Sequence, residues 1–349
     1  MTSPAPTALS TGTLRSGRLN RLQGMSAAAA GVALSALLFW VTPFQGRADF
    51  LVVTYVLAVA AYLVAAARVE GRRSVSDRLA GILMVTAVGI SLLALGSVLV
   101  YTALRGVKVM SLDFFTHSMN GVGPRDTTGG AYHAIIGTLE QVLLAALISV
   151  PSGLVVAVYL SEYGRGRLAF AVRMVIDVMV GIPSVVAGLF IYAFWVLGLG
   201  RGFSGFAAAL ALSILMLPIV VRSAEEMIKL VPDSLREASY ALGIPRWRTT
   251  LRVVLPTASA GITTGVMLAV ARVTGETAPL LLTAFGFDAI NNDPFHGPQS
   301  SLPLFVFSQA SSAFENAVDR AWAGALTLIA VVLLLTVAAR LGTRRNRLV

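Results

Sequence analysis

Long apolar runs separated by short polar segments dominate the chain. Eight of these runs are long enough for a helix to cross about 30 Å of hydrocarbon, which takes about 20 apolar residues. They lie at residues 25–43, 50–67, 79–104, 134–160, 169–198, 204–221, 259–284 and 321–341. The pattern predicts an all-α, polytopic membrane protein with about eight transmembrane helices.

The first 24 positions differ from the rest of the chain. Residues 1–24 are rich in Ser, Thr and Pro and have no apolar periodicity, so we expect a disordered cytoplasmic tail. The first apolar run continues through Phe39 and Trp40 and has no small-residue cleavage motif. This pattern favours a retained membrane anchor over a signal peptide.

The basic residues predict the orientation in the membrane. Placing the N-terminus inside puts 20 of the 27 lysines and arginines in inner segments and six in outer ones, with Arg272 inside a run. Inner loops carry such an excess, so both termini are predicted to be cytoplasmic. The same bias accounts for the net charge of +10 without nucleic-acid binding. The chain has no cysteine and only three scattered histidines, which argues against disulfides and metal clusters.

One long polar stretch, from Val231 to Pro256, is itself punctuated like a folded element. Asp233 is a candidate helix N-cap, Gly243 a stop signal, and Pro245 the start of a second helix. The first predicted helix has a narrow face of small or apolar residues: Leu235, Ala238, Ala241 and Leu242. Such a face suits docking into a groove of a partner, although an ordinary surface helix pair would have a similar pattern.

Two charged residues lie inside the seventh run. Arg272 and Glu276 are four residues apart, which predicts a shared helix face. An unpaired charge at the bilayer centre costs about 2.5 to 3.5 kcal/mol, so such side chains usually face a bundle interior. Two interpretations stay open: the pair neutralises itself within one helix, or Arg272 supplies positive potential along an anion pathway while Glu276 orients it.

Other charged residues lie in neighbouring runs. Arg173 and Asp177 repeat the four-residue spacing near the predicted cytoplasmic end of the fifth run, where a structural pair within the helix is expected. Glu140, in the fourth run, has no partner in its own helix. Protonation, contact with water and pairing with another chain are three open alternatives for it.

Helix-breaking residues cluster in the fourth to seventh runs. They are Pro151, Gly153, Gly181, Pro183, Pro218, Gly275 and Pro279. Proline is tolerated in membrane helices where neighbours satisfy the freed backbone groups, often beside a cavity. We therefore expect bent helices that form a moving pathway, with the first three runs peripheral to it.

The chain has no phosphate-binding loop for ATP. Such a loop needs Gly-Lys-Ser/Thr, and the only lysines, Lys108 and Lys229, follow Val and Ile. We therefore predict that the chain is not an enzyme. An ATP-driven process would need its ATPase on a separate subunit.

The polar stretch resembles the cytoplasmic signature of ABC importer permeases, which reads Glu-Ala-Ala, three residues, Gly, nine residues, then Ile-x-Leu-Pro. Here Ser239 replaces the second Ala and Val253 replaces Ile. In that family the loop, here residues 222–258, is a coupling helix that sits in a groove of the ATP-binding subunit. The residues to which the resemblance gives this role are Glu237, Ala238, Gly243, Leu255 and Pro256.

Several other stretches resemble the A-type permeases (PstA) of phosphate-specific ABC importers. They are 129–139, Tyr159 to Tyr163, Gly181 to Leu189, Arg272 to Leu280, and the outer stretches Leu112 to Thr116 and Ser301 to Leu304. The resemblance covers about residue 79 to the C-terminus. It implies that 79–341 is the permease domain, with its core at 134–341, that 25–78 adds two N-terminal helices, and that 342–349 is a cytoplasmic tail. It also favours a pathway role for Arg272, Glu276, Thr277, Pro183 and Ser184.

The resemblance implies a multi-pass subunit of a bacterial inner or plasma membrane that transports inorganic phosphate. Its expected partners are a homologous C-type permease, two copies of an ATP-binding subunit, and an external phosphate-binding lipoprotein. This chain is expected to bind no cofactor, with ATP and Mg on the partner ATPase. Import of another oxyanion and proton-coupled secondary transport through Glu140 and Glu276 are the alternatives, beside a signalling subunit that transports nothing.

Overall fold

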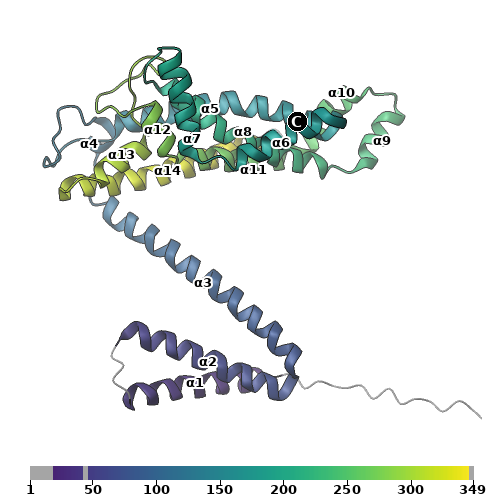
Figure 1. Cartoon of the computed structure of the whole chain (residues 1–349), viewed down its shortest axis with the longest axis vertical. Coiled ribbons are helices and arrows are strands. Elements are labelled where there is room, and N and C mark those ends of the chain that lie inside the picture. Colours follow the sequence, from purple (N-terminus) through teal and green to yellow (C-terminus); the bar gives the residue numbers. More distant parts are fainter. Residues whose placement is uncertain (1–18, 42–45, 346–349) are drawn as a thin grey trace, which may run out of the picture. The chain divides into compact units, whose positions relative to one another are not determined.

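The computed structural model describes residues 19–41 and 46–345 as two compact units (Figure 1). The first unit comprises residues up to Val98 and the second begins at Leu99. Nearly all of the described chain is helical. A single bridge between Phe285 and Gln299 is the only strand-like pairing in the described residues.

Close backbone approach holds the first unit together. Helix α1 (Arg21–Val41) packs along α2 (Arg47–Glu70). A Cβ on Gly31 would lie 2.6 Å from the Cα of Ala58, so only glycine fits at this contact. The hydroxyls of Ser35 and Thr54 are hydrogen-bonded at 2.8 Å beside it. Small residues and hydrogen-bonded hydroxyl pairs of this kind commonly stabilise helix–helix contacts in a membrane.

Helix α3 (Arg72–Gly106) contains the boundary between the two units. Its Arg78 pairs with Glu70 at 2.5 Å, which closes the turn that follows α2. Helix α1 begins at Arg21, so the last four residues of the segment 1–24, predicted as a disordered tail, are helical. The part of that prediction up to residue 18 lies outside the described residues. So do residues 346–349 of the predicted tail at 342–349.

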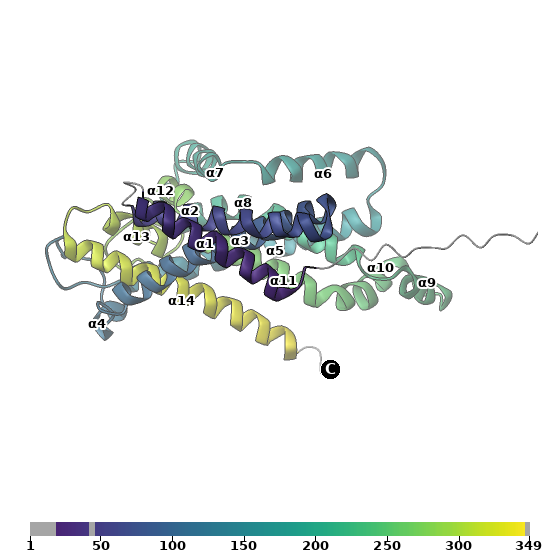
Figure 2. The same ribbon diagram turned by 90° about the horizontal axis from the view of Figure 1, so that it is seen from below.

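The second unit is a bundle of helices with an excursion at each end. Its elements are α4 (Leu112–Thr116), α5 (Tyr132–Val158), η1 (Tyr159–Tyr163), α6 (Gly166–Val180), α7 (Ser184–Ile191), η2 (Tyr192–Gly198), α8 (Gly205–Lys229), α9 (Asp233–Ala241), α10 (Arg246–Thr249), η3 (Thr250–Val254), α11 (Leu255–Thr274), α12 (Ala278–Thr283), α13 (Leu302–Ala310) and α14 (Glu315–Arg345). Figure 1 and Figure 2 both place α9 and α10 at one end and α4 and α13 at the other. The outer stretches singled out in the sequence are thus the short helices α4 and α13.

Helix α8 is the centre of this bundle, since it packs against α5, α6, α7, α11 and α12. Its buried face begins with small residues: Ala207, Ala208, Ala209 and Ala211. These let neighbouring helices approach closely. Further along, Leu212, Met216 and Val220 form one apolar cluster with residues of α5 and α11, and Val221 and Ile228 belong to a second. This arrangement explains why α8 is by far the most buried of the predicted spans.

The described residues contain seven helices long and apolar enough to cross a membrane, or eight if the bent pair α6 and α7 with η2 is one span. The prediction of about eight spans is therefore confirmed. The prediction of bent helices is correct at Gly181 to Pro183, where the chain turns by 105°, and at Gly275, where α11 ends. At Pro151 and Pro218 the chain stays helical, because α5 and α8 continue through these residues without a break.

Candidate functional site

The predicted coupling loop is a folded excursion between α8 and α11. The segment outside these two helices is residues 230–254, shorter at both ends than the predicted 222–258. Asp233 is not the N-cap of α9: Pro232 holds that position, and Asp233 is the first helical residue. Its carboxylate instead accepts a bond of 3.0 Å from Arg236 Nη1. Gly243 is the stop signal as predicted, with a φ of 75° that favours glycine.

The outward face of this loop carries large apolar side chains that nothing in the described chain covers. Leu242 is 80% exposed, Trp247 55% and Leu235 41%. Glu237 and Ala238 are exposed on the same helix. A monomeric soluble surface rarely groups such side chains, so this face is suited to docking against a partner.

The remaining signature residues lie on the other arm of the loop and have a different role. Leu255 is half-buried against the apolar cluster that contains Val254 and Ala258. Pro256 is the second residue of α11, which continues the helical run that begins at Arg246. These two residues therefore belong to the span itself, while Glu237 and Ala238 are exposed on α9.

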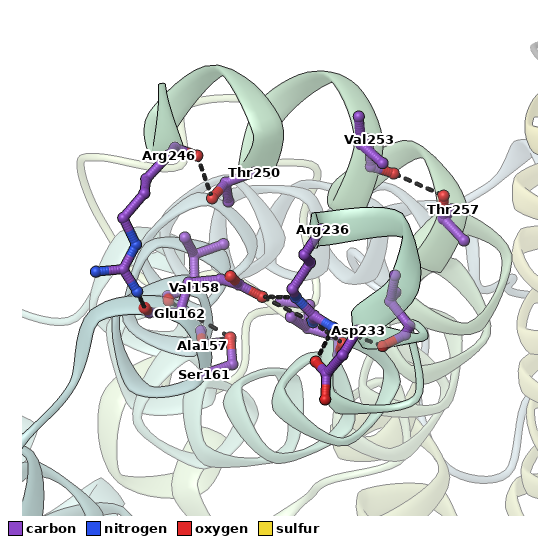
Figure 3. Close-up of polar contacts among 12 residues, drawn as sticks. Ala157, Val158, Ser161, Glu162, Asp233, Arg236, Arg246, Thr250, Val253 and Thr257 are labelled. Carbon is purple, nitrogen blue, oxygen red and sulfur yellow. Dashed lines mark hydrogen bonds and ion pairs between the residues drawn. The ribbon is translucent and has the colours of Figure 1, made fainter. Parts of the chain in front are cut away.

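The loop is tied to the bundle by polar contacts (Figure 3). Arg236 Nη2 donates to Glu162 Oε1 at 2.9 Å, and Arg246 Nη2 donates to the Glu162 carbonyl at 3.0 Å. Inside the loop, the hydroxyls of Ser239 and Thr249 are 2.8 Å apart and buried. A polar cavity of about 410 Å³ lies between η1 and α9, with Glu237 and Tyr240 among its lining residues.

Two interrupted spans of the second unit meet at the short helices α7 and α12. Helix α7 follows the break at Gly181 to Pro183, and α12 follows the break at Gly275 to Thr277. The two short helices pack on each other so closely that a Cβ on Gly188 would lie 2.7 Å from the Cα of Pro279. Irregular backbone inside a membrane protein is found where it is buried in protein or lines a cavity, so these breaks mark the candidate pathway.

The predicted pathway residues all lie at these breaks. Pro183 and Ser184 lie where α7 begins, the first exposed and the second half-buried. Thr277 is the N-cap residue of α12 and makes no side-chain cap bond. The packing of α7 on α12 brings the two helices together. Pro183, Ser184 and Thr277 each lie at the start of one of these helices.

Arg272 and Glu276 do not share a helix face as predicted. Helix α11 ends at Thr274, so Arg272 lies in its last turn and Glu276 in the break beyond Gly275. Within the described part of the chain neither side chain has an ion pair or hydrogen bond. Self-neutralisation within one helix is therefore excluded in this structure, and Arg272 presents an exposed positive charge beside an interrupted span.

The expected pair between Arg173 and Asp177 is also wrong. Arg173 instead lies 3.3 Å from Glu225, and Asp177 pairs with Arg222. Both partners come from α8, which packs against α6 and brings opposite charges within reach. The two ion pairs thus fasten α6 to α8.

Glu140 has a partner that its sequence position did not reveal. Gln299, from the segment before α13, donates to Glu140 Oε2 at 2.6 Å and to the carbonyl of Asn291 at 3.0 Å. Gln141 donates to Gln299 Oε1 at 3.0 Å and to the carbonyl of Ser300 at 3.2 Å. The network holds the Gln299 segment against α5. A sequence separation of 159 residues leaves no local signal for it.

A buried arginine holds the other long outer loop. The side chain of Arg320, in α14, donates to the carbonyls of Asp126 and Thr128 at 2.5 and 3.2 Å. Its Nε bonds to Gln309 Oε1 at 3.1 Å. Phe114 is buried under the same loop and packs edge-on against Phe305. These contacts are structural and contain no group of three His, Asp or Glu side chains suited to a metal, which holds for all described residues.

A bundle of membrane-spanning helices with two interrupted spans and an exposed helix pair at one end is the architecture expected of a membrane permease. The family model for the inner membrane component of binding-protein-dependent transport systems matches residues 149–347, more than half of the chain. The chain belongs to this family, in the branch that holds the phosphate transport system permease proteins PstA. It is a multi-pass membrane subunit of a transport system and not an enzyme.

Two relatives and one solved structure illustrate the similarity. The phosphate transport system permease protein PstA 1 of Mycobacterium tuberculosis (strain H37Rv) is 45% identical over 282 residues, 79% of this chain and 92% of that protein. PstA of Xylella fastidiosa (strain 9a5c) is 42% identical over 245 residues, 70% of this chain and 84% of that protein. A bacterial alginate ABC transporter with its pentasaccharide-bound periplasmic protein aligns with a TM-score of 0.56 at 14% identity, over 78% of this chain and 96% of that one, which shows a shared fold.

Proposed function

We propose that this chain is the membrane-spanning half of an ATP-driven importer of inorganic phosphate. Phosphate is proposed as the cargo because the chain is 40 to 45% identical to phosphate transport system permease proteins over most of its length. The exposed apolar face of α9 and α10 supports a separate subunit as the source of energy.

The proposed assembly contains this chain, a homologous second permease, two copies of an ATP-binding subunit and an external phosphate-binding lipoprotein. ATP and Mg belong to the ATP-binding subunits, and this chain binds no cofactor of its own. The coupling residues Glu237 and Ala238 are exposed on α9, so a docked ATP-binding subunit can contact them. Gly243 ends the arm that carries them, and Leu255 and Pro256 lie in the helical run that continues the other arm into the membrane.

In the proposed mechanism, closure of the ATPase dimer moves α9, and the interrupted spans alternate between outward and inward access. Arg272 lies beside the break in the span of α11 and α12 without a neutralising partner in the described chain. Its charge favours an anion at that depth, because electrostatic interactions strengthen as water is excluded. Glu276, two residues beyond the end of α11, weakens the attraction enough for the anion to leave.

Reconstituted vesicles test this function directly. Vesicles that hold this chain with its partners should accumulate phosphate only when ATP is inside and the binding protein outside. Uptake without ATP, driven by a proton gradient, would refute the proposal in favour of secondary transport. Competition by sulfate or molybdate as effective as by unlabelled phosphate would instead identify another oxyanion as the cargo.

A further inference from the structure

Both arms of the coupling loop converge on one residue of a membrane span. Arg236, from α9, places Nη2 and Nε at 2.9 and 3.2 Å from Glu162 Oε1. Arg246, from α10, donates to the carbonyl of the same residue at 3.0 Å, and its guanidinium lies 5.7 Å from the centre of the Tyr163 ring. Figure 3 shows the two arginines reaching Glu162 from opposite sides.

The contact between the Arg236 and Glu162 side chains is largely buried. The side chains of Glu162 and Arg236 are 7% and 14% exposed, whereas Asp233, the other acidic neighbour of Arg236, is 89% exposed. A buried charge pair is screened far less than a surface pair, and losing one partner leaves the other without compensation. The contact between α9 and η1 is therefore a firm one.

Little else fastens α9 to the bundle. Ser239 is its one buried residue, and the Ser239 hydroxyl bonds to Thr249 within the same loop. Arg236 also donates to the carbonyls of Ile228 and Val231, where α8 gives way to the loop. Among the described residues, Arg236 thus supplies the only side-chain hydrogen bonds from α9 to a span that is not its direct neighbour in sequence.

The residue that receives these bonds belongs to a continuous rod. Glu162 lies in η1, a π-helical turn that extends α5 and is closed by the Gly164 amide on the Tyr159 carbonyl at 2.5 Å. Such π turns recur at functional sites within long helices. Helix α5 has 27 residues, a length of about 40 Å at 1.5 Å per residue. In its third turn from the other end, Gln141 bonds to Gln299. A displacement of Glu162 would therefore act on the same helix that holds the Gln299 segment.

We propose that Glu162 and Arg236 are positioning residues for energy coupling, whose ion pair passes the movement of the coupling loop to α5. The inference rests on the proposed function, because it takes a partner ATPase as the source of the movement. A purely structural pair would affect folding and ATPase docking; a coupling pair affects how much transport each hydrolysed ATP produces.

The first test compares transport with hydrolysis in the same vesicles. The complete complex carrying Glu162→Gln should retain its ATPase at wild-type yield and hydrolyse ATP within about twofold of wild type. Phosphate uptake per ATP should fall about tenfold or more. Glu226→Gln is the matched control, since Glu226 is exposed on α8 and has no side-chain partner among the described residues, and it should leave the ratio unchanged. Exchange of the charges, Glu162→Arg with Arg236→Glu, should restore much of the lost coupling.

The second test needs no assumption about the cargo. The chain has no cysteine, so spin labels can be placed at Ser152→Cys on α5 and Ser234→Cys on α9, both exposed. The distance between the labels should stay narrow through ATP binding in the wild-type complex and broaden in the Glu162→Gln complex. Equal distance distributions in both, or uptake and hydrolysis falling in the same proportion, would overturn the inference. Wild-type vesicles that hydrolyse ATP without taking up phosphate would refute phosphate as the cargo. The label distances would still decide the role of the Glu162–Arg236 pair.

Discussion

The Gln299 network allows a stability prediction with a worked magnitude. Replacing Gln299 with leucine keeps its approximate size and removes its bonds to Glu140, Asn291 and Gln141. A hydrogen bond to a charged group contributes about 1.5 to 3 kcal/mol and a neutral one about 0.5 to 1.5 kcal/mol. Gln141 keeps its bond to the Ser300 carbonyl, so the net loss is about 3 kcal/mol. For a unit of this size, that corresponds to a fall in melting temperature of about 6 to 12 °C.

The measurement is the fraction of protein that stays monodisperse on size-exclusion chromatography after heating in detergent. Thiol-reactive dyes cannot be used, because the chain has no cysteine. Asn292→Leu is the control: Asn292 is exposed in the same loop and has no side-chain partner in the described chain, so its melting temperature should stay within about 2 °C of wild type. If Gln299→Leu matches this control, the network does not hold the segment against α5 in the membrane protein.

Three further predictions follow from contacts described above. Gly188→Val should push α7 off Pro279 and abolish most ATP-driven uptake, whereas Gly181→Ala should transport normally, because a Cβ there would have only the Val178 carbonyl oxygen near it, at 3.5 Å. Leu242→Asp should reduce co-purification of the ATPase about tenfold without lowering the melting temperature, because the side chain is 80% exposed; equal ATPase recovery would contradict docking on this face. Hydrogen bonds from the Phe295 amide and His296 lower the pKa of the Asp293 carboxyl below its ordinary value of 3.8, so their stabilisation is present above about pH 4 and is lost as the pH falls. Amide exchange at Phe295 should accelerate on acidification in wild type and be independent of pH, once corrected for intrinsic exchange, in Asp293→Asn.

Sequence patterns predicted the features that depend on local, additive signals. Hydropathy summed over about 20 residues located the spans, including the one that the structure bends by 105°. Gly243 was identified as a helix stop because few other residues accept its φ of 75°. The loop between α8 and α11 was also predicted, because the residues that start and stop its helices give local signals within one short stretch of sequence.

Pairings between distant segments could not be predicted in this way. The spacing of Arg173 and Asp177 says which side chains can meet along one helix, but α8 brings Glu225 and Arg222 within reach of them. Glu140 finds Gln299 through a loop more than 150 residues further along the chain. The break after Thr274 likewise removed Glu276 from the helix face assigned to it, because a glycine and a proline four residues apart end a helix that hydropathy alone would continue.

The contacts of the first unit have a consequence for how the protein is made. Gly31 against Ala58, Ser35 with Thr54, and Glu70 with Arg78 all join residues before Val98. At about 5 to 20 residues per second, a ribosome needs roughly 10 to 50 seconds to produce the remainder of the chain. The N-terminal hairpin therefore has time to insert and close before the permease helices emerge, so its assembly is independent of theirs. Ribosome-bound chains stalled near residue 140 should already protect this hairpin from protease.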